Sequence, residues 1–192
     1  MQRFIFNEKV KLTLLLEQLN ACMDLFNAKD YATDKALALV LKDCIQTFKA
    51  LGYADKESQV QSLKAELVTA QRGMNPYTLQ KQNMGRNEMF TSVMFKILQA
   101  LEVQLRTYYL VGDEKLQQAR DLISQIIVAA LQGGLLTNLD IKNIKTQKQT
   151  EAAWKKLGED ANISLGQKRV LLIVSPYDAF ILFDELITTL KK

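Results

Sequence analysis

The chain has 192 residues, of which 48% are hydrophobic and 24% charged, and its formal net charge is +4. This composition excludes a disordered chain, because enough apolar surface is available for burial, and it lacks the strong basic excess of dedicated nucleic-acid binders. No apolar run approaches the roughly 20 residues of a membrane-spanning helix, so the sequence predicts a cytoplasmic protein without a membrane span.

Apolar residues recur at steps of three and four through most of the chain. The first such series is Leu12, Leu15, Leu19, Cys22 and Phe26. This spacing places the side chains on one face of a helix, whereas a strand would need a step of two. The chain has only two prolines and eight glycines, which also favours long helices because both residues are unfavourable in helix interiors.

Three helices are predicted before residue 74. The first covers about residues 7–28, and the second begins after Asp30 or Thr33, either of which is a suitable N-cap. Gly52 ends the second helix, since glycine accepts the left-handed conformation at low cost. Asp55 caps the third helix, which ends at Gly73.

The polar segment 74–86 interrupts this pattern, and three further helices follow it. Asn87 caps a helix that Gly112 is expected to stop, and the next helix runs from Asp113 to the glycine pair at 133–134. A helix beginning at Asn138 or Asp140 continues to about residue 157.

The C-terminal part contains one ambiguous element and one clear one. Residues 170–174 are all apolar, which fits either a buried strand or a buried helical turn, and we favour a helix because a lone strand would have nothing to pair with. Ser175, Pro176 and Asp178 then mark a helix start, with a capping serine, proline in the first turn and an acid at the third position.

We therefore predict an all-α fold, a single-domain antiparallel bundle of six to seven helices covering residues 1–192. Two quasi-repeated three-helix halves, 1–73 and 87–158, are an alternative organisation. In that case the polar segment 74–86 links the halves and a C-terminal helix covers 175–192.

The chain contains no histidine, so the commonest general base and metal ligand are absent. The adjacent acids Asp184 and Glu185 point to different helix faces and do not form an acid–base pair. Cys22 and Cys44 both fall on apolar helix faces and are interpreted as small buried hydrophobes. We predict a protein that is not an enzyme and has no cofactor and no metal site.

Two surfaces are candidates for binding a partner. The first is segment 74–86 with Tyr77, Lys81 and Arg86, which alternatively is only a crossover between two parts of a bundle. The second is the lysine-rich helix 142–156, where Lys145 and Lys148 lie near Trp154. Acidic residues flank these lysines and weaken their field, so nucleic-acid binding is the less favoured interpretation.

Surplus apolar residues supply the third indication of binding. They lie beyond the main stripe of the first and last helices: Leu14, Leu16, Met23, Leu182 and Leu186. Such a helix is either central in the bundle or meets a partner. Our leading hypothesis is a non-enzymatic protein-interaction module that binds a partner protein or forms a homodimer. The alternatives are a nucleic-acid-associated regulatory protein and a carrier of a small apolar ligand in an inter-helix pocket.

Overall fold

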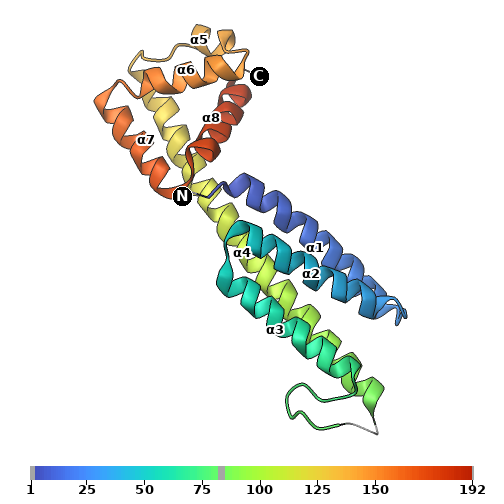
Figure 1. The fold of residues 1–192 in the computed structure, drawn as a ribbon. Helices are drawn as coiled ribbons and strands as arrows, with labels where there is room; N and C mark the ends of the chain where they lie inside the picture. The colour runs from blue at the N-terminus through green and yellow to red at the C-terminus, as the bar shows by residue number, and fades with distance from the viewer. Residues whose placement is uncertain (1–2, 82–84, 192) are drawn as a thin grey trace. The chain divides into compact units, whose positions relative to one another are not determined.

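The computed structural model describes residues 3–81 and 85–191. Over these residues the fold is all-helical, with eight helices and no strand, which confirms the all-α prediction. Figure 1 shows the helices, whose bounds are α1 (Ile5–Asn27), α2 (Thr33–Leu51), α3 (Ala54–Gln71), α4 (Arg86–Gln132), α5 (Asn138–Asn143), α6 (Gln147–Leu157), α7 (Ala161–Ile173) and α8 (Pro176–Leu190).

The contacts within the chain divide it into two compact units. The central unit comprises residues 10–109, and the terminal unit comprises residues 1–9 and 110–192. The buried apolar side chains form two clusters, and each cluster lies within one unit. These bounds differ from those of the predicted halves 1–73 and 87–158, and the quasi-repeat stays a prediction.

In the central unit, α1, α2, α3 and the first part of α4 lie side by side (Figure 1). The predicted α1 stripe faces the core, since Leu12, Leu15, Leu19 and Cys22 are all buried. The α2 ring of Phe48 packs on Tyr108 of α4, with 5.8 Å between centroids. Burial of these apolar faces is the main force that holds the helices together.

The turn between α2 and α3 confirms the predicted role of Gly52. This residue has φ 73°, in the left-handed region, and its N–H donates to the Lys49 carbonyl at 3.1 Å. Glycine adopts this conformation without the Cβ clash of other residues. The chain therefore turns here, and α3 packs along α2.

The terminal unit is built around α8 and the last part of α4. Phe183 and Ile187 of α8 are fully buried, and the Trp154 ring of α6 lies 4.9 Å from that of Phe183. Residues 170–174, the ambiguous apolar run, belong to α7 and its C-cap, so a helix is confirmed. That run is not buried throughout, because Leu172 is 86% exposed while Val170 and Val174 are buried.

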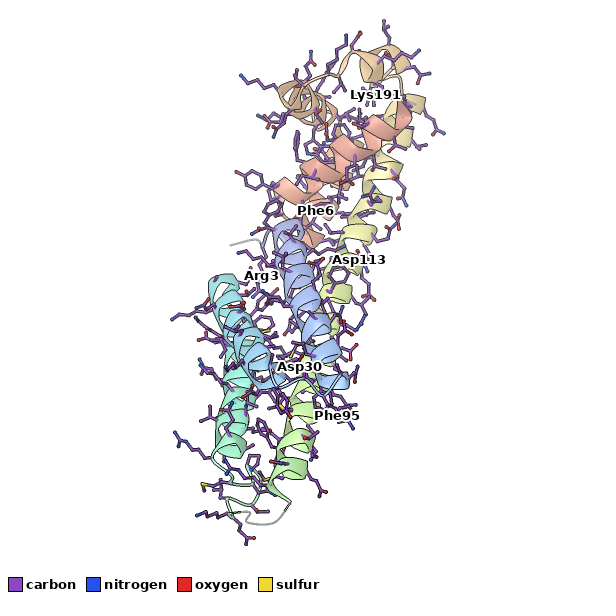
Figure 2. All side chains as sticks on the ribbon, turned by 90° about the vertical axis from the view of Figure 1, so that its right-hand side faces the viewer. Arg3, Phe6, Asp30, Phe95, Asp113 and Lys191 are labelled. Carbon is purple, nitrogen blue, oxygen red and sulfur yellow. The ribbon has the colours of Figure 1, made fainter. Side chains whose placement is uncertain are left out.

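The predicted helix start at residue 175 is also confirmed, and it fixes the beginning of α1. The Ser175 hydroxyl accepts from the Asp178 amide, and the Asp178 carboxylate accepts from the Ser175 amide, as in a capping box. The same buried carboxylate accepts from the backbone amides of Ile5 at 3.1 Å and Phe6 at 3.0 Å. Figure 2 labels Phe6 within the terminal unit.

The prediction that Gly112 stops a helix is wrong, because α4 continues through it to Gln132. A Cβ at residue 112 would lie 3.3 Å from Ile5 Cγ2 and 3.7 Å from Lys9 Cγ. Lys9 also pairs with Asp113, which Figure 2 labels. Glycine at this position therefore serves the close approach of two helices rather than a helix end.

The prediction of one helix from 138 to about 157 is also wrong. The chain forms α5 and α6, with a break at residues 144–146. Each helix has its own capping box, Thr137 with Asp140 and Thr146 with Gln149. The described residues form eight helices, compared with the predicted six to seven.

Over the described part of the chain, none of the helices combines the length and the hydropathy needed to cross a bilayer.

Candidate functional site

Tyr77 lies on the connection between α3 and α4, in the central unit, and is 53% exposed. Its hydroxyl donates to Glu66 Oε2 at 3.0 Å, and Lys96 Nζ lies 4.6 Å from its ring centroid. Desolvation, aided by the hydrogen bond to Glu66, raises the pKa of the phenol. These contacts tie the connection to α3 and α4, so the Tyr77 ring is a fixed surface feature.

The other two predicted residues of this connection play different parts. Lys81 is exposed and forms an isolated backbone bridge with Met74. The Arg86 guanidinium donates to the Gln71 carbonyl at 2.8 Å and covers Gly73. Arg86 therefore closes the end of α3. Residues 82–84 of the predicted segment 74–86 lie outside the described residues.

Lys145 and Lys148 belong to the terminal unit and do not share a helix. Lys145 lies in the break between α5 and α6, where its amide donates to Gln149 Oε1 at 2.7 Å, and Lys148 lies in the first turn of α6. Both side chains are exposed. The continuous lysine-rich helix 142–156, on which the nucleic-acid hypothesis depended, is replaced by two short helices.

Trp154 is a packing residue of the terminal unit. Its ring is half-buried against Phe183, and its carbonyl accepts from Gln167 Nε2 at 2.8 Å. The predicted acids are similarly engaged: Asp184 accepts from the Thr150 hydroxyl at 2.8 Å, and Glu185 pairs with Arg120. These contacts hold α6 and α4 against α8.

The two cysteines are free and buried, as predicted for small hydrophobes. Burial raises the pKa of the Cys22 thiol to about 11. Burial, with a smaller effect of the Asp43 charge, raises the pKa of the Cys44 thiol to about 12. Both groups are therefore neutral thiols at physiological pH, whereas a nucleophilic cysteine reacts as the thiolate.

An open cleft of about 710 Å³ lies in the central unit, where the end of α1 meets the first turns of α4. The rings of Phe26 and Phe95 stack across it with centroids 6.1 Å apart. Phe95 is 48% exposed, whereas its neighbour Met94 is buried. Figure 2 labels Phe95 and Asp30 at this end of the unit. The remaining lining residues are polar: Lys29, Asp30, Thr33, Asn87, Glu88, Thr91 and Ser92.

Sequence reasoning missed this cleft, although one signal was present. Phe95 follows Met94 directly and therefore lies off the inner stripe of its helix, as an aromatic residue with no place in the core. The surplus apolar residues of the first and last helices differ in burial. Leu182 is fully buried, Leu16, Met23 and Leu186 are half-buried, and Leu14 is 55% exposed.

The described residues contain no group of three side chains placed to hold a metal ion. Comparison with models of protein families, with curated proteins and with solved structures gives no match for this chain. Inference about function therefore depends on the chain's own surfaces, among them the Phe26–Phe95 cleft.

Proposed function

We propose that the protein is a non-enzymatic helical interaction module whose Phe26–Phe95 cleft binds an apolar side chain of a partner polypeptide. The observation that carries the proposal is the half-exposed Phe95 ring, stacked on Phe26 in an open cleft with a polar and charged rim. An aromatic floor inside a polar rim is typical of the energetic centre of a protein interface.

The size and setting of the cleft favour a polypeptide segment as the ligand. Its lining residues come from the end of α1, the turn before α2, the first residue of α2, and α4, so the floor is held by packed helices. A cleft whose aromatic floor is held by packed helices can accept the anchor residue of an amphipathic helix at little cost in its own ordering. Lys29, Asp30 and Glu88 around the rim then select the charges that flank the anchor.

The test compares Phe95→Asp with Val103→Asp, both in α4. Val103 is 67% exposed and does not line the cleft. Size-exclusion chromatography with light scattering measures self-association, and affinity capture from the native host measures binding to other proteins. We expect Phe95→Asp to lose the association, by about 2 kcal/mol or more if Phe95 is the anchor site, and Val103→Asp to retain it. Circular dichroism should show equal helix content in both variants.

Two results would contradict the proposal. One is an association that survives Phe95→Asp unchanged. The other is an association that weakens steeply with salt and disappears when Lys145 and Lys148 are replaced by glutamate, because that pattern indicates phosphate contacts. The light-scattering experiment also decides whether the partner is a second copy of the chain or another protein.

A further inference from the structure

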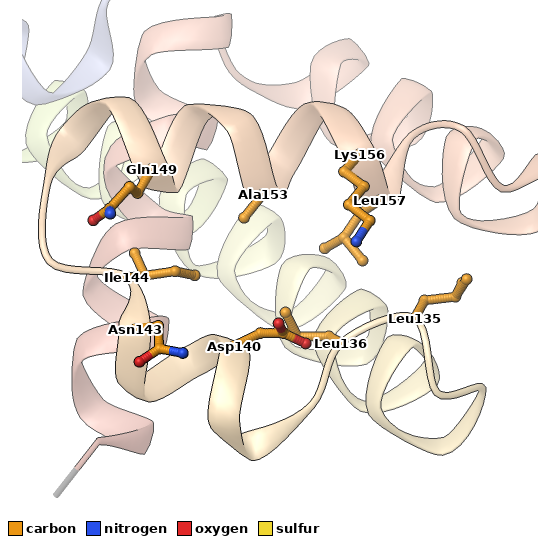
Figure 3. Close-up of a pocket in the computed structure, with 9 residues that line it drawn as sticks. All are labelled: Leu135, Leu136, Asp140, Asn143, Ile144, Gln149, Ala153, Lys156 and Leu157. Carbon is orange, nitrogen blue, oxygen red and sulfur yellow. The ribbon is translucent and has the colours of Figure 1, made fainter.

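A second cavity, of about 210 Å³, lies in the terminal unit between α5, α6 and the segment before α5 (Figure 3). It is smaller than the roughly 300–1,000 Å³ of pockets for drug-sized ligands. The cavity therefore suits a molecule of few heavy atoms.

One wall of the cavity is apolar and firmly placed. Leu136, Ile144 and Leu157 are buried members of the terminal core, and Ala153 packs against the same core. Leu135 adds a partly exposed apolar side chain at the edge. A ligand must present apolar surface to this wall, because polar groups placed there would lose their hydrogen bonds to water.

Two opposite charges line the same cavity from different helices. Figure 3 shows Asp140 on α5 and Lys156 on α6, with both side chains directed into the space between these helices. Asp140 Oδ2 already accepts from the Thr137 amide at 2.9 Å and from its hydroxyl at 2.6 Å. Both residues are solvent-exposed, and within the part of the chain that the structure describes neither Asp140 Oδ1 nor the Lys156 ammonium forms a hydrogen bond with another protein group, nor do the two form an ion pair.

The ionisation of Asp140 is compatible with binding a cation. The Thr137 hydroxyl and amide, and to a smaller extent the charge of Lys156, hold the pKa of this carboxyl below its usual value. Asn143 also lines the cavity. Gln149 does not contribute a free acceptor, because its Oε1 accepts from the amides of Lys145 and Thr146.

We propose that this cavity binds a free α-amino acid with a branched apolar side chain, such as leucine. Its ammonium would contact Asp140, its carboxylate Lys156, and its side chain the apolar wall. A carboxylic acid alone would satisfy Lys156 but meet repulsion from Asp140, and an amine alone would meet the reverse. A zwitterion is the ligand that satisfies both charges together with the wall. This site shares no residue with the Phe26–Phe95 cleft, so it stands independently of the proposed function.

Isothermal titration calorimetry on the full chain tests the proposal, with L-leucine and two analogues that each lack one charge, 4-methylpentanoate and 3-methylbutylamine. We expect leucine to bind with one site per chain and each analogue to bind about tenfold more weakly, or worse. A hydrogen bond to a charged group contributes on the order of this factor. Leucine should also raise the thermal unfolding midpoint, as ligands of the folded state do.

Two pairs of variants locate the site. Asp140→Asn keeps an oxygen for Thr137 but removes the charge, and Lys156→Met removes the ammonium; each should weaken leucine about tenfold. The matched controls are Glu151→Gln and Lys155→Met, exposed α6 residues that do not line the cavity. These controls should leave the affinity unchanged. Ala153→Leu fills the cavity and should abolish binding while the protein stays helical by circular dichroism.

Absence of heat and of any thermal shift with leucine at about 10 mM, where even a millimolar site would be mostly filled, would overturn the proposal. So would equal binding of leucine and the two analogues, or equal losses in the charge variants and their controls. Loss of association in Phe95→Asp would not change the leucine result, so the two proposals fail separately.

Discussion

Asp178 is the residue on which the terminal unit depends most directly. Its side chain is fully buried and accepts hydrogen bonds from the amides of Ile5, Phe6 and Ser175 and from the Ser175 hydroxyl. A buried carboxylate is costly unless such donors surround it, and the donors are equally costly without it. The sequence predicted Asp178 as part of a helix start, but its contact with residues 5 and 6 could not be predicted, because no local pattern reports a partner 172 or 173 residues away.

Asp178→Ala should lower the free energy of unfolding by about 3 kcal/mol, since it removes a helix cap and leaves several buried donors without an acceptor. Urea denaturation followed by circular dichroism measures the change. The matched control is Asp121→Ala, an exposed aspartate whose carboxylate accepts from Gln117 one turn away. The control should shift stability by less than about 0.5 kcal/mol. Equal effects of the two variants would contradict this role for Asp178.

The buried thiols give a pH dependence. Their pKa rises from 9.0 to about 11 for Cys22 and about 12 for Cys44 on folding. Between pH 9 and 11 the unfolded state therefore releases thiol protons that the folded state keeps, so stability falls as the pH rises through this window. A variant with both cysteines replaced by alanine should lose less stability over the same window. Parallel pH profiles of the two proteins in urea titrations would show that the thiols play no part.

At the scale of elements, local chemistry explains both the successful predictions and the failures. Gly52 adopts the left-handed conformation and ends α2. Gly112 lies inside α4, where Ile5 and Lys9 approach it closely. One-dimensional sequence cannot distinguish these two uses of glycine. The break between α5 and α6 was readable, since Thr146 and Gln149 have the spacing of a capping box. The contact of the candidate residue Trp154 with Phe183 could not be predicted, because the two rings belong to helices far apart in the sequence.

Gly112→Val should destabilise the protein by about 2 kcal/mol, because the added side chain must displace Ile5 from a packed contact. Thr107→Val is a matched control that places the same side chain at an exposed position of α4. It should change stability by less than about 0.5 kcal/mol. The two variants are compared by thermal and urea unfolding. A stabilising Gly112→Val would mean that the space at residue 112 is not restricted.

At the scale of the whole molecule, the two apolar clusters are the main finding that periodicity could not supply. Helical spacing identifies which face of a helix is buried, and the stripes of α1 and α2 were predicted in this way. It does not identify which helices share a core. The sequence predicted a single bundle, with two halves as an alternative organisation, and could not show that Leu101 and Ile123 of the same helix α4 belong to different clusters. Contacts between distant segments decide this, and they leave no periodic signal.

Separate clusters predict separate responses to core mutations. Phe183→Ala in the terminal unit and Phe48→Ala in the central unit each remove a fully buried ring and should cost about 3–5 kcal/mol. Native-state hydrogen exchange should show faster exchange mainly in α6–α8 for the first variant and mainly in α2 and α3 for the second. Uniform loss of protection in both variants would show instead that the chain opens as one cooperative unit.

The hydrogen bond from Ile5 to Asp178 also constrains how the protein folds during synthesis. Residues 10–109 can assemble their core while later residues are still being added, because every member of that cluster lies in this range. The start of α1, by contrast, must wait for an acceptor 173 residues downstream. On the ribosome the chain would therefore carry a folded middle and an unattached N-terminal turn until α8 emerges. During that interval the apolar residues at the start of α1 are exposed and can be bound by chaperones.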